Sequence, residues 1–346
     1  MGAIPHFQSG SAIAVIMLIP SVAAVWLLRF SERFNFRYNK ITAFEIGRDR
    51  VRDGIFALLC VIVIMAILSV FAIMFIVPFI KSWPYQVVFT TETLQRILSD
   101  SSIKIVYINS VMVAAATAVI GTVLAYMAAL VNARSHLPGI CKLLMDVFAM
   151  VTNTVPGMVI GVAFLFTFTG TSLQNTFLLI ILLNSIREFT TPYLMIQASL
   201  SKINLSWETT GALMGDSWAK TIFRVIIPNT MSTVFQMLSY IFVQALVTIS
   251  AIVFITGART MVMTTKITQA QYFEKYDEVF VLSLLIFLTN ILVKIMFDYL
   301  ANHNDIVLHI KVKRKFQGLS KKSPRSGKPA RLQANVQVQE YTIKNM

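Results

Sequence analysis

The sequence predicts an all-α, polytopic membrane protein with about seven transmembrane helices. Hydrophobic residues make up 56% of the 346-residue chain and charged residues only 13%, whereas soluble domains carry about 25% charged residues. The apolar residues fall in blocks of about 20 rather than in a periodic stripe, and a block of that length crosses the hydrocarbon core of a bilayer. Lysines and arginines gather in alternate loops between the blocks, as in chains that cross a membrane repeatedly.

The apolar blocks define seven candidate spans. They cover residues 11–30, 55–80, 107–131, 143–168, 177–197, 229–256 and 281–300. The fifth contains Arg187 and Glu188, which either face a polar pathway or mark a span that ends earlier, near the interface. The first has no basic residue before it and a basic loop after it, which argues against a signal peptide.

The basic residues also set an orientation. Six lysines and arginines lie in the loop 31–54 and ten in the segment 301–346, whereas the loop 169–176 has none. The positive-inside rule then places the N-terminus outside, and the loop 198–228 and the C-terminus in the cytoplasm. The net charge of +14 arises largely from these loops and the tail, so it does not indicate a nucleic-acid partner. The tail is expected to be disordered and attracted to anionic membrane lipid.

Residues that could carry chemistry are scarce. The two cysteines, Cys60 and Cys141, offer no disulfide framework, and the four histidines have no metal-ligand spacing. The chain contains no glycine-rich phosphate-binding loop of the G-x-x-x-x-G-K-[ST] kind. We therefore expect no catalytic residue, no metal and no cofactor on this chain.

A segment of mixed polarity, residues 204–228, separates the fifth and sixth spans. Its first half predicts a helix through Glu208 that stops at Gly215, the residue type that adopts a left-handed C-terminal cap without strain. Asp216 is expected to cap a second short helix. Pro228 is expected to separate that helix from the sixth span, because proline lacks a backbone donor and disfavours helix in the residue before it. A small, rigid element at the membrane surface should result.

The second of these short helices is expected to be amphipathic. Its apolar residues are Trp218, Ile222 and Phe223, and its charged residues are Asp216, Lys220 and Arg224. An ordinary surface loop of any polytopic protein could show the same pattern.

The segment also resembles the cytoplasmic EAA loop of permease subunits of binding-protein-dependent ABC importers. Gly215 and Pro228 have the spacing of that loop. The other matching positions are Ser217, Phe223, Arg224 and Ile227. The front departs from the pattern, because Thr209 stands where the acid is usual and Glu208 lies one residue earlier. Thr210 and Gly211 stand where the pattern has alanines.

This resemblance implies a type I importer permease with a six-helix core, here the residues 55–300. The loop would be the coupling helix that docks on separate ABC ATPase subunits, which would bind ATP and Mg. A second permease core and an extracytoplasmic solute-binding protein would complete the complex in the cell inner membrane. Residues 1–54, with an extra helix and a basic linker, would be either the remnant of a tandem permease or an accessory helix.

The fourth and sixth spans hold the candidate pathway residues. Asn153, Pro156 and Gly157 lie in the fourth span, where the proline should bend the helix and the G-x-x-x-G pair Gly157 and Gly161 should allow close packing. Gln244 in the sixth span either lines a pathway or bonds between helices. The sixth span resembles those of ferric-iron and 2-aminoethylphosphonate permeases, and the expected solute rests on that resemblance alone.

Two other functions remain open at this stage. One is a secondary transporter driven by an ion gradient, with Arg187, Glu188 or Asp146 as the coupling site. The other is a membrane scaffold whose basic tail recruits partners.

In the seventh span, Lys294 and Asp298 are expected to pair with each other, since they lie four residues apart on one helix face.

Overall fold

The computed structural model describes residues 49–322 apart from 84, 136 and 205, together with the single residues 16, 20 and 27. The chain divides into two compact units, residues 1–301 and residues 302–346. Almost all of the first expected span and the basic loop after it therefore lie outside the described residues, as does the tail beyond residue 322. The elements of the first unit determine where the candidate site lies.

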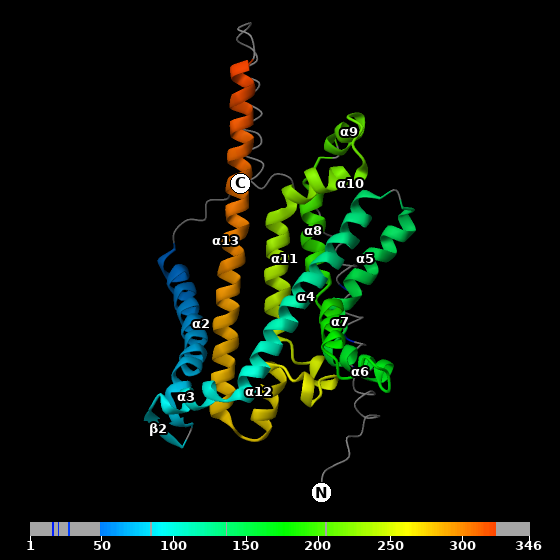
Figure 1. Ribbon diagram of the computed structural model, residues 1–346. Coiled ribbons are helices and arrows are strands. Elements are labelled where there is room, and N and C mark those ends of the chain that lie inside the picture. The colour runs from blue at the N-terminus through cyan, green and yellow to red at the C-terminus, as the bar shows by residue number, and fades with distance from the viewer. Residues whose placement is uncertain are drawn as a thin grey trace. The chain divides into compact units, whose positions relative to one another are not determined.

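Helices dominate the described part of the chain (Figure 1). They are α2 (Arg50–Ile76), α3 (Glu92–Ser99), α4 (Ser101–Arg134), α5 (Gly139–Thr154), α6 (Gly157–Phe168), α7 (Phe177–Arg187), α8 (Thr190–Ser201), α9 (Ser206–Leu213), α10 (Trp218–Thr221), α11 (Ile227–Val247), α12 (Met263–Tyr272) and α13 (Tyr276–Lys322). Short 3-10 turns occupy Val77–Phe79, Ile252–Phe254 and Ala258–Thr260, and a π-helical turn occupies Ile222–Ile226. The strands β1 (Ile80–Ser82) and β2 (Gln86–Phe89) form a small antiparallel hairpin.

The all-α, multi-pass membrane fold expected from the sequence is confirmed. Within the described residues, four helices are long and apolar enough to cross a membrane, and a bent pair of helices could make a fifth span. The four are Arg50–Phe79, Ser101–Arg134, Trp218–Val247 and Tyr276–His303. They correspond to the second, third, sixth and seventh spans expected from the sequence.

Helix α4 lies at the centre of the bundle and packs against α7, α8 and α11. Its buried face carries a row of small residues, Ala114, Ala118, Gly121, Ala125 and Ala129, spaced three or four apart. Small side chains at this spacing allow helix backbones to approach closely, which is how helices associate in a bilayer where the lipid is as apolar as the protein.

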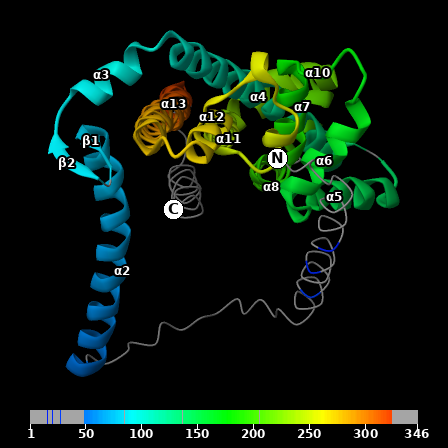
Figure 2. The same cartoon turned by 90° about the horizontal axis from the view of Figure 1, so that it is seen from below.

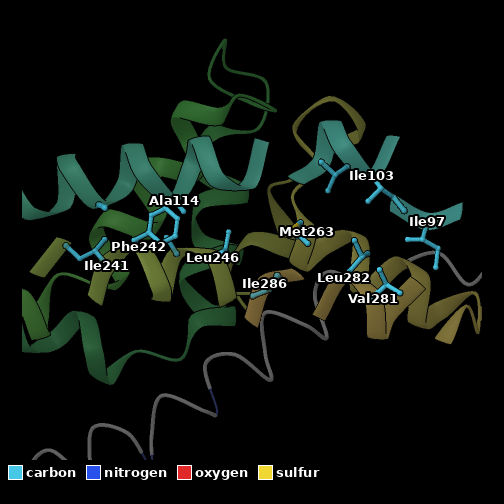
Figure 3. Packing of buried hydrophobic residues seen from close by; sticks show 13 residues of the cluster. Ile97, Ile103, Ala114, Ile241, Phe242, Leu246, Met263, Val281, Leu282 and Ile286 are labelled. Carbon is cyan, nitrogen blue, oxygen red and sulfur yellow. The ribbon is translucent and has the colours of Figure 1, made fainter. Parts of the chain in front are cut away.

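Among the described residues, three buried apolar clusters hold the helices together. In the first, Ala114 of α4 faces Phe242 and Leu246 of α11, and Met263 and Leu282 extend the cluster into α12 and α13 (Figure 3). The second joins α4, α8 and α11 through Ala125, Ala129, Tyr193, Ile196, Ile226 and Met237. The third joins α7 to the segment after α11 through Leu179, Ile180, Ala251 and Ile252.

The hairpin and α3 connect α2 to α4, and α2 is set apart from the bundle (Figure 2). The hairpin pairs Ile80 with Phe89, and the Trp83 N–H donates to Asp277 Oδ1 at the start of α13 (3.4 Å). This hairpin was not predicted from the apolar pattern. Its strands are only three and four residues long, too short to show a clear alternation of apolar and polar residues.

The fourth expected span is broken rather than bent. Helices α5 and α6 meet at an angle of 103° across Val155 and Pro156. Val155, the C-cap of α5, takes extended backbone angles, because the ring of Pro156 disfavours helix in the residue before it. The fifth expected span is also divided, between α7 and α8, with the break at Glu188 and Phe189.

The prediction that Pro228 ends the loop is wrong. The helical backbone continues from Trp218 through the π turn Ile222–Ile226 into α11, whose first turn contains Pro228. The Ile227 N–H bonds to the Ile222 carbonyl, five residues back. This wider turn removes the clash that a proline ring would make with the carbonyl four residues before it.

The last helix is longer than the sequence predicts. The seventh span was expected to end at residue 300 and the tail to be disordered beyond Lys311, but α13 remains helical to Lys322. Residues 302–322 belong to the second unit.

Candidate functional site

Helices α9 and α10 form a compact loop at the end of the bundle where α4, α8 and α11 also have ends (Figure 1). Gly215 has the left-handed backbone predicted from the sequence, with φ of 78°. The Asp216 N–H bonds back to the Gly211 carbonyl at 3.0 Å. This six-to-one bond closes α9 with a Schellman-type cap, which satisfies a carbonyl that the helix end leaves free.

The cap of the second short helix differs by one residue from the prediction. Ser217, not Asp216, is the N-cap of α10, and its hydroxyl accepts from the Lys220 N–H (3.4 Å). Asp216 instead forms an ion pair with the side chain of Lys220. The flexible ammonium reaches the carboxylate from four residues away, and the serine hydroxyl takes over the cap.

Close packing holds the two short helices against each other. A Cβ atom on Gly211 would lie 2.9 Å from Thr221 Oγ1, so a larger residue would push α9 away from α10. Thr221 itself is buried. Gly211 therefore permits the close approach for which the related loops use small residues.

Glu208, on the first turn of α9, is directed into the protein. Its Oε1 lies 3.0 Å from Nε of Arg134, the last residue of α4, and the Glu208 side chain is mostly covered. Thr209, the next residue, is exposed. The acid of this loop therefore forms an ion pair within the chain.

The outward surface of the loop is apolar. Leu213, Met214, Trp218 and Phe223 are all more than half exposed, whereas Ile222 is buried. The predicted apolar face is thus divided, since Ile222 is in the core and Trp218 and Phe223 are exposed. Arg224 is exposed on the same segment. An exposed apolar patch of this kind marks a surface that meets another protein or the membrane.

A second cluster surrounds the break between α5 and α6. Arg187 Nη1 donates to Ser250 Oγ (2.5 Å), and Arg187 Nε lies 3.3 Å from Glu188 Oε1. A Cβ atom on Gly157 would lie 2.4 Å from Arg187 Nη1, and one on Gly161 would lie 2.4 Å from the Ala251 carbonyl oxygen. The close approach predicted for the glycine pair is therefore present, against the segment that follows α11.

An open groove of about 210 Å³ lies between α11 and α13. Its lining residues are Gln236, Ser239, Tyr240, Val243, Gln244, Lys294 and Asp298. The Tyr240 hydroxyl donates to Thr191 Oγ1 (3.2 Å) and lies beside Glu188. Tyr240 thereby connects Gln244 in the groove to the cluster at Arg187 and Glu188.

The predicted pairing of Lys294 with Asp298 is wrong. Both side chains line the groove, and no ion pair joins them in the part of the chain that the structure describes. Charged groups at membrane depth are costly unless they are paired or hydrated. The groove therefore holds two charged side chains within a lining that is mostly apolar surface.

Two of the other expected site residues lie elsewhere. Asn153 is exposed near the end of α5 and joins neither cluster through a hydrogen bond among the described residues. Asp146 Oδ1 accepts from Asn132 Nδ2 (2.8 Å), Tyr193 Oη (2.6 Å) and Gln197 Nε2 (3.3 Å). This network ties α5 to α4 and α8.

Arg134 and Tyr240 were not predicted as site residues. Arg134 counted only as a basic loop residue, although an arginine in the last turn of a span could have signalled a partner. Tyr240 carries no such signal, since one polar residue in an apolar run does not identify its contacts.

Comparison with solved structures gives the same fold. The crystal structure of a bacterial ABC transporter involved in the import of the acidic polysaccharide alginate matches with a TM-score of 0.60 and 12% identity, over 73% of this chain and 96% of that one. A bacterial alginate ABC transporter in complex with alginate pentasaccharide-bound periplasmic protein matches with a TM-score of 0.57 and 12% identity, over 73% and 94%. Comparison with curated protein sequences gives no significant match.

The sequence pattern of one family covers more than half of the chain. It is described as the binding-protein-dependent transport system inner membrane component, and it matches residues 121–305. The match includes the loop of α9 and α10, the broken pair α5 and α6, and the groove between α11 and α13. This chain belongs to the family of membrane permease components of binding-protein-dependent ABC importers.

Proposed function

We propose that the chain is the permease subunit of an ATP-driven importer and that the loop of α9 and α10 is the surface on which its ATPase docks. The observation that carries the proposal is the exposed apolar set Leu213, Met214, Trp218 and Phe223 on a loop fixed by the cap at Gly215. A rigid apolar surface can receive force from a partner. ATP and Mg would bind the ATPase, so this chain would need no cofactor of its own.

The proposed orientation places this loop in the cytoplasm, where ATP is available. The distribution of basic residues supports it, since the loop 198–228 contains Lys202, Lys220 and Arg224 while 169–176 contains no lysine or arginine. The hairpin, α3 and α12 would then lie on the outer side. A solute-binding protein would approach from that side.

A second permease core would complete the pathway. The groove between α11 and α13 is open, and its two charged residues, Lys294 and Asp298, are exposed and form no ion pair with the described residues. A partner core placed over the groove would enclose a hydrated path along Gln244 and Tyr240 toward Arg187 and Glu188. Binding of nucleotide would bias such a path between outward and inward access.

For the solute we propose ferric iron or a phosphonate-like anion. The resemblance of the sixth span to permeases of that type supports both, and the cations Arg187 and Lys294 beside the proposed path favour the anion. The solved relatives are described as importing an acidic polysaccharide, which makes a larger acidic solute the second candidate.

The docking role is tested by Gly215→Trp and by deletion of 208–217. Either change is expected to leave the chain in the membrane and abolish its co-purification with the ATPase. Gly170→Trp is the matched control, because Gly170 has the same φ of 78° and the same free space for a Cβ atom but follows α6. Normal ATPase pull-down by the Gly215→Trp chain would refute the docking role.

The alternative, that an ion gradient drives solute uptake, is tested in the same preparation. The proposal predicts that uptake stops when ATP is depleted and persists when the proton gradient collapses. The reverse result would make the chain a secondary transporter. The partners of Asp146 and the pairing of Arg187 with Glu188 disfavour that alternative, since both sites are satisfied within the chain.

A further inference from the structure

Arg134 occupies a junction of three helices. It is the last residue of α4, and only 6% of its side chain is exposed. Its Nη2 donates to the Leu200 carbonyl at 2.8 Å and to the Ile203 carbonyl at 3.0 Å, at the end of α8. Its Nε lies 3.0 Å from Glu208 Oε1 on α9.

The electrostatics of the junction suit an arginine. Helices α4 and α8 both end here, and the C-terminus of a helix carries partial negative charge. The guanidinium group is planar and offers several donors in a fixed arrangement, so one side chain can serve two carbonyls and a carboxylate together. A buried cation is costly unless its charge is balanced. Two carbonyls accept hydrogen bonds from Arg134, and the Glu208 carboxylate balances its charge in an ion pair.

The position of Arg134 decides how α9 is attached. On one side Gly211 packs against Thr221 of α10. On the other, the ion pair with Arg134 ties Glu208 to α4, which itself packs against α7, α8 and α11. Without Arg134, α9 would be held through α10 and a short linker after α8.

We propose that Arg134 is a positioning residue that makes α4, α8 and α9 move as one body, so that force on the docking loop reaches the centre of the bundle directly. The inference rests on the proposed function. Glu208 then acts inside the chain, as the attachment point of α9, while the exposed apolar residues of the loop meet the ATPase.

The test measures how readily a water-soluble reagent reaches the groove in the complete importer, reconstituted with its ATPase and partner core. Cys60 and Cys141 are replaced by serine, Gln244 is replaced by cysteine, and the labelling rate with a water-soluble maleimide is measured with and without ATP. The parent is expected to show a change of about fivefold or more on addition of ATP. Arg134→Gln is expected to co-purify with the ATPase and to hydrolyse ATP, yet to lose this change.

Arg52→Gln is the matched control, because it removes an arginine from an exposed ion pair with Asp53 and should keep the full ATP effect. If Arg134→Gln does not assemble, Glu208→Gln decides the question, since it keeps the shape of the side chain and removes only the charge of the pair. A full ATP effect in either variant would overturn the inference. Absence of an ATP effect in the parent would instead overturn the proposed function, and the inference with it.

Discussion

Helices α4 and α2 are both long and apolar enough to cross a membrane. Of the two, only α4 is extensively packed against the rest of the chain. Of the α4 span, 44% is buried inside the chain, against 6% of the α2 span. No residue of α2 is buried, and its aromatic contacts in the described structure are those of Phe71 and Phe75 with Phe287 of α13. Length and hydrophobicity therefore decide whether a helix enters the membrane, and do not decide what it packs against.

The two helices differ in side-chain size and in polar partners. The row of alanines and glycine on α4 lets α8 and α11 approach, whereas α2 is covered with large aliphatic and aromatic residues. Polar side chains of α4 also reach across the bundle: Tyr126 Oη bonds with Thr230 Oγ1 (3.0 Å), and Tyr107 Oη with Thr289 Oγ1 (2.9 Å). We infer that the outer surface of α2 is left for lipid or for a second core.

Among the polar contacts, the largest effect on stability is expected from the network at the end of α4. Asp146→Ala removes the acceptor that Asn132 and Tyr193 share, and both are buried. Leaving buried donors without a partner should lower the free energy of unfolding by about 3 kcal/mol. Denaturant titration of the purified chain in detergent measures this.

Asp53→Ala is the control for that experiment. It removes an equivalent carboxylate from an exposed ion pair on α2 and should change the free energy of unfolding by less than about 0.5 kcal/mol. Equal losses for the two variants would mean that the network does not hold α5 to α4.

An intermediate effect is expected from enlarging the small residues. A Cβ atom on Gly121 of α4 would lie 3.2 Å from Ile241 Cδ1, so the two further methyl groups of valine would force α11 away. Gly121→Val should therefore cost about 2 kcal/mol of unfolding free energy. Gly54→Val in α2 meets nothing within 4 Å and should cost much less. A comparable loss of stability in both variants would contradict the role assigned to side-chain size.

The smallest effect is expected on the surface of α2. Leu59 is half exposed, so Leu59→Ala removes few contacts within the chain and should change its unfolding free energy by less than about 0.5 kcal/mol. The same substitution at the fully buried Leu200 of α8 should cost about 3 kcal/mol. A large loss for Leu59→Ala in the isolated chain would show that α2 packs on the bundle after all.

Much of the fold and of the docking loop could be predicted from the sequence. The apolar runs specify α2, α4, α11 and α13, because the transfer of apolar side chains out of water depends on composition and length alone. The left-handed residue at Gly215 was equally predictable, since glycine adopts that backbone without strain. Helix α9 and its end were located for the same local reason.

Local rules failed where two local interactions compete. Asp216 and Ser217 are both good caps, and the nearby ammonium of Lys220 decides that Ser217 takes the position. Pro228 is read as a helix stop, yet a single wide turn at Ile222–Ile226 lets the helix pass through it. The competing local conformations differ in free energy by only about 1 kcal/mol, and contacts with neighbouring residues easily outweigh such a difference.

The sequence by itself determined that the chain is a set of apolar helices with one capped polar loop, because those properties follow from residues close together along the chain. Only the tertiary structure decided that Arg134 meets Glu208, that Gly157 lies against Arg187, and that Lys294 lines a groove with Gln244. Such contacts join residues from separate helices, and the packing of small and large side chains between those helices, which no local pattern records, brings them together.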